Sequence, residues 1–158
     1  MNLPTTADIV IIGGGVMGAS AAYHLAQRGI AGRNIVLLEK EGFFGQGATG
    51  RCAGGVRYQF STAINIKLSL ESLPMLERFK DEIGQDVSYK QCGYLLVATN
   101  EKDVNVFKRN VKLQNELGVQ TQLLNGDEVR KRLPLMNLTM PSQAHSTKKT
   151  GRLTQTAW

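Results

Sequence analysis

The chain has 158 residues, of which 42% are hydrophobic and 20% are charged, and its formal net charge is +6. This length suits one domain with a core, and the composition is that of an ordinary globular protein without repeats or low-complexity segments. The positive charge is not gathered in one arm and no nucleic-acid-binding module accompanies it, so we expect no nucleic-acid partner.

The first predicted elements are a strand, a glycine turn and a helix. Ile9–Ile12 is a continuous β-branched run, which is typical of a strand buried on both faces of a parallel sheet. Residues 16–28 carry small side chains at helical spacing, so this helix can lie close to the strand. We expect Gly13 to permit the tight turn, Gly15 to let the backbone approach a pyrophosphate, and Gly18 to allow helix and strand to pack.

A second strand, predicted at residues 34–39 after the stop signal of Gly29, ends in an acidic residue. The order strand, glycine turn, helix, strand and acid is that of a dinucleotide-binding unit, in which the helix N-terminus faces the phosphates. Glu39 lies about 20 residues beyond the last glycine, where it can accept hydrogen bonds from a ribose hydroxyl. Because an acid at this place would repel a 2′-phosphate, the candidate cofactors are NAD and FAD.

A second glycine-rich stretch, GATGRCAGGVRYQF at residues 47–60, follows the acid where a plain NAD domain would normally enter its next helix. Together with DIVIIGGGVMGASAAYHLA and VLLEK, it resembles the FAD-dependent amine and amino-acid oxidoreductases of the D-amino-acid oxidase type. The resemblance is greatest to the branch of sarcosine oxidase β-subunits, glycine oxidases and related dehydrogenases, and it covers residues 7–138.

The resemblance implies a cofactor site made from both glycine segments. In that family the first segment holds the ADP part of FAD, and the second wraps the pyrophosphate and runs beside the flavin. Arg51 stands where some relatives carry a histidine that attaches FAD covalently, so we expect non-covalent FAD. The alternative for the second segment is a flexible surface loop of small residues. The residues expected to bind the cofactor are Gly13, Gly15, Val16, Met17, Gly18, Glu39, Lys40, Gly47, Ala48, Thr49, Gly50, Arg51, Ala53, Gly54 and Gly55.

Arg57 and Tyr58 end this segment and leave two interpretations open. They face the flavin or a substrate carboxylate, or they are a loop charge with a packed neighbour. No acid or base in the chain is a secure catalytic candidate, so the catalytic residues stay unassigned. His24 and His145 each lack metal-ligand spacing to another ligand residue, and we therefore expect no metal site.

Beyond residue 60, the pattern predicts helices and strands at the border of a substrate domain. Ser61-Thr62 is a predicted cap for a helix that Pro74 should kink or split. An apolar stripe along this helix is expected in the core, at Ile66, Leu70, Leu73, Leu76, Phe79 and Ile83. Further strands are predicted at residues 87–90, 93–99 and 119–124, and helices at 101–117 and 126–133.

The predicted fold class is α/β: a Rossmann-like βαβ FAD-binding unit, followed by the start of an α+β substrate-domain region, with an incomplete sheet. We divide the chain into the N-terminal part of the FAD-binding domain (1–60), helix and strands bordering the substrate domain (61–138), and a basic C-terminal tail (139–158). Family members are more than twice this length, which is consistent with truncation of a longer enzyme. Uncovered apolar edges would then call for a partner chain that completes the fold.

The expected compartment is the cytoplasm. Cys52 and Cys92 lie in different settings, which favours a reducing compartment over a disulfide scaffold. Residues 1–8 contain no basic residue, and the apolar run that follows is too short to span a membrane. We therefore expect neither a signal peptide nor a membrane span.

By resemblance, the expected function is FAD-dependent oxidation of an amine or amino acid of the N-methyl or secondary-amine class. The reaction is hydride transfer to the flavin, and the chain is expected to be a fragment of a longer enzyme, inactive alone. The alternatives are a non-catalytic truncated or nucleotide-binding chain that needs a partner, and an NAD-binding module.

Overall fold

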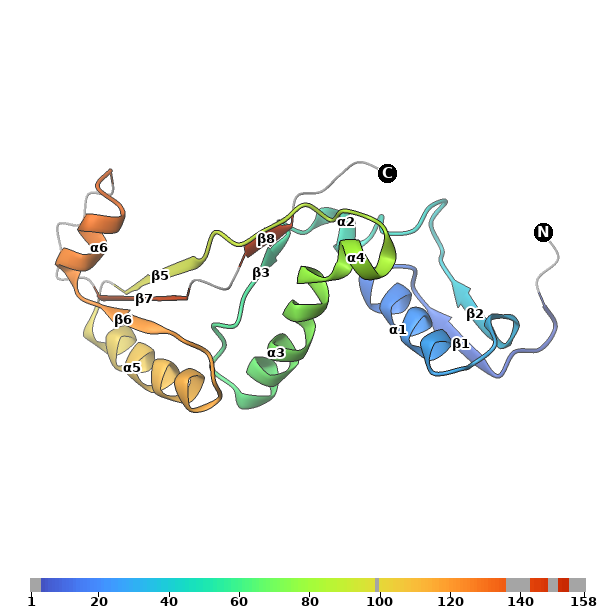
Figure 1. Cartoon of the computed structure of the whole chain (residues 1–158), viewed down its shortest axis with the longest axis horizontal. Helices are drawn as coiled ribbons and strands as arrows, with labels where there is room; N and C mark the ends of the chain where they lie inside the picture. Colours follow the sequence, from blue (N-terminus) through green and yellow to red (C-terminus); the bar gives the residue numbers. More distant parts are fainter. Residues whose placement is uncertain (1–3, 99, 136–142, 148–150, 154–158) are drawn as a thin grey trace. The chain divides into compact units, whose positions relative to one another are not determined.

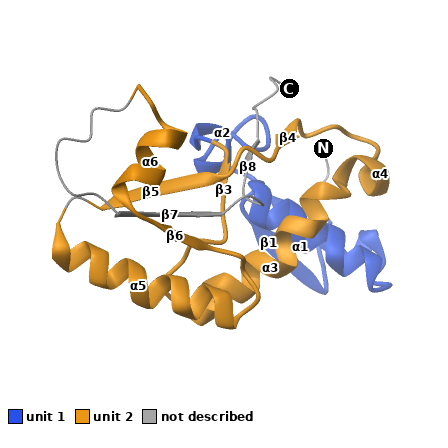
Figure 2. Cartoon of the chain, turned by 60° about the vertical axis from the view of Figure 1, so that its left-hand side comes forward, with its two compact units in different colours: residues 1–53 blue, residues 54–158 orange. Residues whose placement is uncertain are grey.

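The protein divides into two compact units, Met1–Ala53 and Gly54–Trp158, which are coloured separately in Figure 2. The computed structural model describes residues 4–98, 100–135, 143–147 and 151–153. The division expected at residue 60 concerns the domains of a complete enzyme and stays a prediction.

The first unit is a βαβ arrangement with a short helix after its second strand (Figure 1). Its strands are parallel, with Ile9 opposite Ile35 and Ile12 opposite Leu38, and the longer helix lies between them in sequence. The elements are β1 (Ile9–Ile12), α1 (Val16–Gln27), the 3₁₀ turn η1 (Gly32–Asn34), β2 (Ile35–Leu38) and α2 (Ala48–Arg51). The predicted order of strand, helix and strand is confirmed.

One expectation for β1 is wrong: the strand is not buried on both faces. Its residues alternate, with Val10 54% exposed and Ile12 87% exposed, while Ile9 and Ile11 are half-buried. The sheet has two described strands, and α1 contacts β1 and β2. Because the described part of this unit offers nothing to cover the other face, every second apolar side chain of β1 meets solvent.

In its described residues, the second unit contains two three-stranded antiparallel sheets with helices between their strands. The strand order is β3-β8-β4 in one sheet and β5-β7-β6 in the other. The elements are β3 (Gly55–Val56), α3 (Ala63–Glu77), α4 (Phe79–Ile83), β4 (Tyr89–Lys90), β5 (Tyr94–Ala98), α5 (Glu101–Glu116), β6 (Gln122–Leu124), α6 (Gly126–Arg132), β7 (Gln143–Thr147) and β8 (Gly151–Leu153). The mixed α/β class with incomplete sheets agrees with the sequence-based prediction.

Pro74 lies inside α3, and the break between α3 and α4 comes only at Arg78. The Arg78 N–H still donates to the Pro74 carbonyl, so the helix passes through the proline before it ends. Thr62 is the N-cap residue in an extended conformation, but its side chain makes no capping hydrogen bond. The predicted position of the cap is therefore confirmed, but the hydrogen bond expected of a capping side chain is not formed.

The core of the second unit forms where α3, the chain after β3 and the chain after α5 meet. Tyr58, Ile66, Leu73 and Val119 are buried together there. Ile66 and Leu73 confirm part of the predicted apolar stripe, whereas Ile83 is 40% exposed and does not belong to the core. The stripe ends early because α4 is a separate short helix, so its residues do not continue the face of α3.

Strands β7 and β8 lie in the stretch for which the sequence predicted a basic tail. β7 is the central strand of its sheet, with Leu95 opposite Ser146 and Leu123 opposite His145. Its sequence, QAHST, has no apolar alternation, so hydropathy gives no strand signal. Pairing of the backbone with strands on both sides accounts for a strand that side-chain pattern alone does not predict. The other residues of the predicted tail are outside the described residues.

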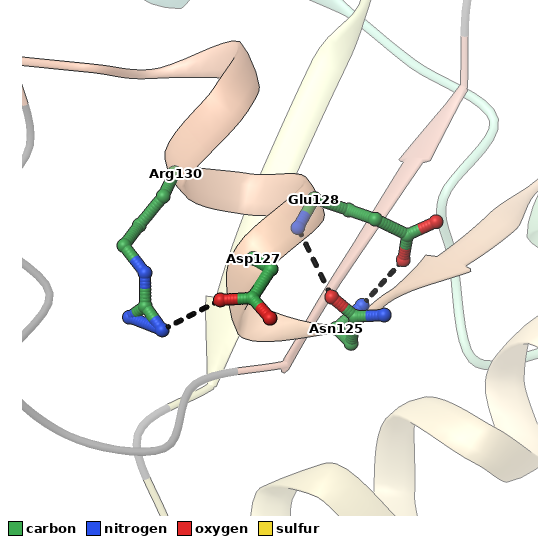
Figure 3. A network of polar contacts seen from close by, with 4 residues as sticks. All are labelled: Asn125, Asp127, Glu128 and Arg130. Atoms are coloured by element: carbon green, nitrogen blue, oxygen red, sulfur yellow. Dashed lines mark hydrogen bonds and ion pairs between the residues drawn. The ribbon is translucent and has the colours of Figure 1, made fainter.

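The last described helix, α6, is fixed by a capping box (Figure 3). The Asn125 side chain accepts from the Glu128 N–H at 3.0 Å, and the Glu128 carboxylate accepts from the Asn125 N–H at 2.8 Å. Asp127 and Arg130 form an ion pair of 3.0 Å on the same helix. The capped helix brings Val129, which is fully buried, onto Leu124 of β6. In the part of the chain that the structure describes, no helix has the length and apolar character needed to cross a membrane.

Candidate cofactor site

The first glycine turn connects β1 to α1 within the first unit. Gly13 has a φ of +105°, which L side chains rarely adopt, and its N–H donates to the Leu38 carbonyl at 2.7 Å. Gly15 is the extended N-cap of α1 and carries no side chain that could cap the helix. The N–H groups at the start of α1 are therefore available to acceptors from other segments.

Gly18 provides the close approach between α1 and β1. A Cβ on this residue would overlap the Gly13 carbonyl oxygen and lie 3.3 Å from Cγ2 of Ile11. The carbonyl belongs to the backbone and cannot move away as a flexible side chain would. Glycine is therefore required here for steric reasons, whatever the turn binds.

Glu39 is bound to the same turn. One carboxylate oxygen accepts from the Gly14 N–H at 2.7 Å, and the other accepts from the Glu41 N–H at 3.1 Å. The Glu41 and Gly14 N–H groups lower the pKa of the Glu39 carboxyl, against the opposing effect of desolvation. Each oxygen keeps a second lone pair, so the carboxylate can accept ribose hydroxyl groups without leaving the turn.

The second glycine-rich stretch lies against the first turn. The Gly45 N–H donates to the Gly14 carbonyl at 3.0 Å, and the Val16 N–H donates to Oγ1 of Thr49 at 2.9 Å. The Thr49 hydroxyl thus accepts at the N-terminus of α1 and still has its own proton to donate. A phosphate oxygen is the natural acceptor for such a hydroxyl beside a helix N-terminus, so these residues fit a dinucleotide pyrophosphate.

Gly14, Phe44 and Gly45 take part in this arrangement, although sequence reasoning did not single them out. A Cβ on Gly14 would overlap the Phe44 ring, and a Cβ on Gly50 would overlap the Gly45 carbonyl. The signal that could have pointed to Gly14 is the run of three consecutive glycines, in which Gly14 stands between the two that the fingerprint requires. Close packing of Phe44 gives that extra glycine a steric reason.

The other residues predicted to bind the cofactor make fewer contacts with the first glycine turn. Lys40 is paired with Glu41 at 3.5 Å and its side chain is 87% exposed. Val16 and Met17 are 61% and 81% exposed at the start of α1. In the second stretch, Gly47 is the N-cap of α2, which comprises Ala48–Arg51, and Ala53 ends the first unit. Gly54 and Gly55 begin the second unit.

The second unit carries an open groove of about 470 Å³ beside β3 and α3. The Arg57 guanidinium lies over the Phe60 ring, 5.2 Å from its centroid, at this groove. A Cβ on Gly55 would overlap the Tyr94 hydroxyl group, which lines the groove as well. None of the residues that line the groove is acidic, and Arg57 forms no ion pair with any residue that the structure describes. The groove therefore favours an anion.

Tyr58 differs from its neighbour, since it is 5% exposed and packs in the core with Ile66 and Leu73. Burial raises the pKa of its hydroxyl, with a smaller contribution from the Glu77 carboxylate. Of the two interpretations left open by the sequence, Tyr58 is the packed neighbour, whereas Arg57 remains available to a ligand. Among the described residues, no group of three or more His, Cys, Asp or Glu side chains could hold a metal ion.

Comparison with known proteins identifies the family of the chain. The model of the family described as FAD dependent oxidoreductase matches residues 8–154. The FAD-dependent oxidoreductase domain-containing protein 1 homolog of Drosophila melanogaster is 37% identical over 138 residues, which are 86% of this chain and 27% of that protein. Mitochondrial dimethylglycine dehydrogenase of Rattus norvegicus is 36% identical over 133 residues, or 84% of this chain and 15% of that protein.

A solved structure, that of L-proline dehydrogenase from P. horikoshii, superposes with a TM-score of 0.84 at 34% identity. The match covers 96% of this chain and 39% of that one. The chain thus spans about a quarter or less of the two curated relatives and less than half of the solved one. The family implies FAD as the cofactor. On the match over residues 8–154 and the shared fold, the chain belongs to the FAD dependent oxidoreductase family.

Proposed function

We propose that the chain is the FAD-binding N-terminal part of a flavoenzyme that oxidises an N-methyl amine or a secondary amine, most readily an amino acid. The observation that carries this proposal is the junction of the two glycine segments, where Thr49 accepts from the first N–H of α1 and Glu39 accepts from Gly14. Relatives named for dimethylglycine and L-proline support the substrate class, because both compounds are N-substituted amino acids.

The cofactor is held without a covalent bond in this proposal. Thr49 donates its hydroxyl proton to the pyrophosphate, and the N–H groups that follow Val16 at the start of α1 donate to the phosphate oxygens. Glu39 accepts the ribose hydroxyls while its existing bonds keep the turn in shape. The chemistry that FAD supplies when bound is acceptance of a hydride from the carbon next to the amine nitrogen. The residues assigned to the cofactor are those expected from the sequence, with Gly14 added.

Arg57 is the residue that we assign to the substrate carboxylate. Its guanidinium is fixed over Phe60, offers a planar set of donors and lies in a groove without acids. The Ser69 and Ser72 hydroxyls in this groove donate to the carbonyls of Asn65 and Leu68. The lone pairs of the two hydroxyl oxygens can therefore accept hydrogen bonds from a ligand. A guanidinium beside hydroxyl acceptors matches a ligand that carries both a carboxylate and an amine.

A second polypeptide segment completes the enzyme in this proposal, supplied by a longer form of the chain or by another chain. The relatives are several times longer than the part matched here, and β1 has exposed Val10 and Ile12. An exposed parallel strand with apolar side chains needs further strands or helices before it is buried.

The test is the visible absorption spectrum of the purified chain before and after addition of FAD, followed by gel filtration. A flavin band that elutes with the protein is expected for the wild type. The Glu39→Ala variant should lose this band. NAD binding without a retained flavin band would support the NAD-module alternative and contradict the proposal. A folded chain that retains neither cofactor would contradict it also, unless the segment that covers β1 restores retention.

A further inference from the structure

Gln114 is an unusual residue for its position in the second unit. It is fully buried near the end of α5, where its neighbours Leu113 and Leu117 pack against the apolar core. Its Oε1 atom accepts no hydrogen bond from the described residues. A buried acceptor without a partner lowers stability, and an apolar side chain of similar size would avoid that penalty. The amide must therefore serve through its other atom.

The Nε2 atom of Gln114 donates to the Phe60 carbonyl at 2.8 Å, over a long separation in the sequence. Because a carbonyl can only accept, this contact sets the orientation of the amide. The Phe60 N–H donates in turn to the Tyr58 carbonyl at 2.7 Å. Both backbone groups of Phe60 are thus bonded, although the residue lies outside any helix or strand.

Phe60 is also the residue whose ring lies beneath Arg57, at 5.2 Å from the guanidinium carbon to the ring centroid. A ring whose backbone is held by hydrogen bonds offers the cation a fixed surface. The contacts therefore form a continuous series from Gln114, through the Phe60 backbone and ring, to the Arg57 guanidinium.

We propose that Gln114 is a positioning residue that holds Phe60 in place and thereby presents the Arg57 guanidinium to an anion in the groove. This inference deepens the proposed function and rests on its assignment of Arg57 to the substrate carboxylate. Gln114 itself is buried behind the segment and touches no ligand.

The experiment uses NMR spectra of the full chain in which the Arg57 side chain is observed directly. In the wild type, the Phe60 ring current shifts the Arg57 side-chain signals upfield. Gln114→Met keeps the size of the side chain and removes the donor, so the fold is retained and most of this shift is lost. Phe60→Leu removes the shift completely but leaves the Gln114 amide protons protected from exchange. Gln85→Met makes the same change at an exposed glutamine and leaves the Arg57 signals unchanged.

Two outcomes would overturn the inference. One is a folded Gln114→Met variant with the wild-type Arg57 shift. The other, which needs no variant, is rapid exchange of the Gln114 amide protons in the wild type while the amides of α5 stay protected. If Gln114→Met fails to fold, this exchange measurement on the wild type still tests the role of Gln114.

Titration with N-methylglycine separates this inference from the proposed function. In the wild type, the Arg57 signals should move as N-methylglycine is added. In Gln114→Met, the apparent affinity for N-methylglycine should be at least severalfold weaker. If wild-type Arg57 responds to inorganic pyrophosphate alone, or to neither compound, its assignment to the substrate carboxylate is wrong. The ring-current comparison then still reports on Gln114 independently.

Discussion

At the scale of single residues, Gly18, Glu39 and Thr49 shape the first glycine turn in different ways. Gly18 leaves room for the Gly13 carbonyl, Glu39 accepts from the Gly14 N–H, and Thr49 accepts from the N-terminus of α1. The first acts by sterics, the second by charge and the third by a neutral hydroxyl. Each therefore has a different experimental signature.

Gly18→Ala should destabilise the first unit, although alanine normally favours a helix. The new Cβ overlaps a backbone carbonyl, and overpacking of this kind costs about 1–3 kcal/mol in the free energy of unfolding. Denaturant unfolding measures the loss. Gly32→Ala is the matched control, because nothing lies within 4 Å of a Cβ there, and its effect should stay within about 0.5 kcal/mol. Equal stability of the two variants would contradict the steric role of Gly18.

Glu39→Gln should remove a stabilising effect that depends on pH. The folded-state pKa of Glu39 is lowered below its ordinary value of 4.5, so the carboxylate stabilises the fold above pH 4.5. That contribution is lost as the pH falls from 4.5 through the lowered pKa. Unfolding curves of wild type and variant should therefore differ at neutral pH and converge in acid. A difference that persists unchanged in acid would argue for a role other than charge; Glu71→Gln on α3 controls for loss of one negative charge.

Thr49→Val should weaken binding of FAD while keeping the shape of the side chain. The variant loses the acceptor for the Val16 N–H and the donor for a phosphate oxygen. A hydrogen bond to a charged group contributes about 1.5–3 kcal/mol, which corresponds to a rise of roughly ten- to a hundredfold in Kd. Fluorescence titration with FAD measures it. Thr49→Ser keeps the hydroxyl and should bind nearly as the wild type does; if both variants bind equally, the hydroxyl is not involved.

At the scale of the elements, local signals predicted α5 and α6 closely. α5 was expected at residues 101–117 and spans Glu101–Glu116, and α6 was expected at 126–133 and spans Gly126–Arg132. Both have an Asn N-cap whose side chain accepts from the third residue of the helix. Such boundaries depend on residues near in sequence, which is why they can be predicted without the fold.

Asn125→Ala tests how much the capping box contributes to α6. Loss of the cap should lower the free energy of unfolding by about 1 kcal/mol, as measured by thermal or denaturant unfolding of the second unit (Figure 3). Asn125→Ser keeps a good capping side chain and should stay close to the wild type. An alanine variant as stable as the serine variant would mean that burial of Val129, rather than the cap, determines whether α6 forms.

The elements that were missed depend on residues far apart in sequence. β7 has a polar sequence and is a strand because β5 and β6 pair with it. Predicted strands at 87–90 and 119–124 shrink to Tyr89–Lys90 and Gln122–Leu124, because only these residues find partners. The site shows the same division: the glycine fingerprint and Glu39 follow from spacing, whereas the roles of Phe44 and Gln114 required the folded contacts.

At the scale of the whole molecule, the exposed apolar face of β1 is the feature on which the proposed completion of the enzyme depends. Ile12 is the most exposed residue of that strand, and a polar residue there should cost little in the isolated chain. In a completed enzyme, the same position would lie where further strands or helices pack. The two situations predict different behaviour for one substitution.

Ile12→Ser should leave the unfolding of the chain alone nearly unchanged but weaken its assembly with a completing segment. The remaining part of P. horikoshii L-proline dehydrogenase, coexpressed as a separate chain, is a suitable partner because the other 39% of that enzyme superposes on this protein. Copurification and retained FAD measure assembly. Lys67→Ser, at an exposed position of α3, is the control. Equal copurification of both variants would contradict the assignment of β1 to the interface.

The pairing of β3 with β8 has a consequence for synthesis of the protein on the ribosome. β1 and β2 are near in sequence, so the first unit can pair its strands soon after residue 38 has left the exit tunnel. β3 must wait for β8, and β5 for β7, so neither sheet of the second unit can close until almost the whole of that unit has been translated. The first glycine turn is therefore complete early in translation, while the segment that carries Arg57 is still unpaired and accessible to chaperones.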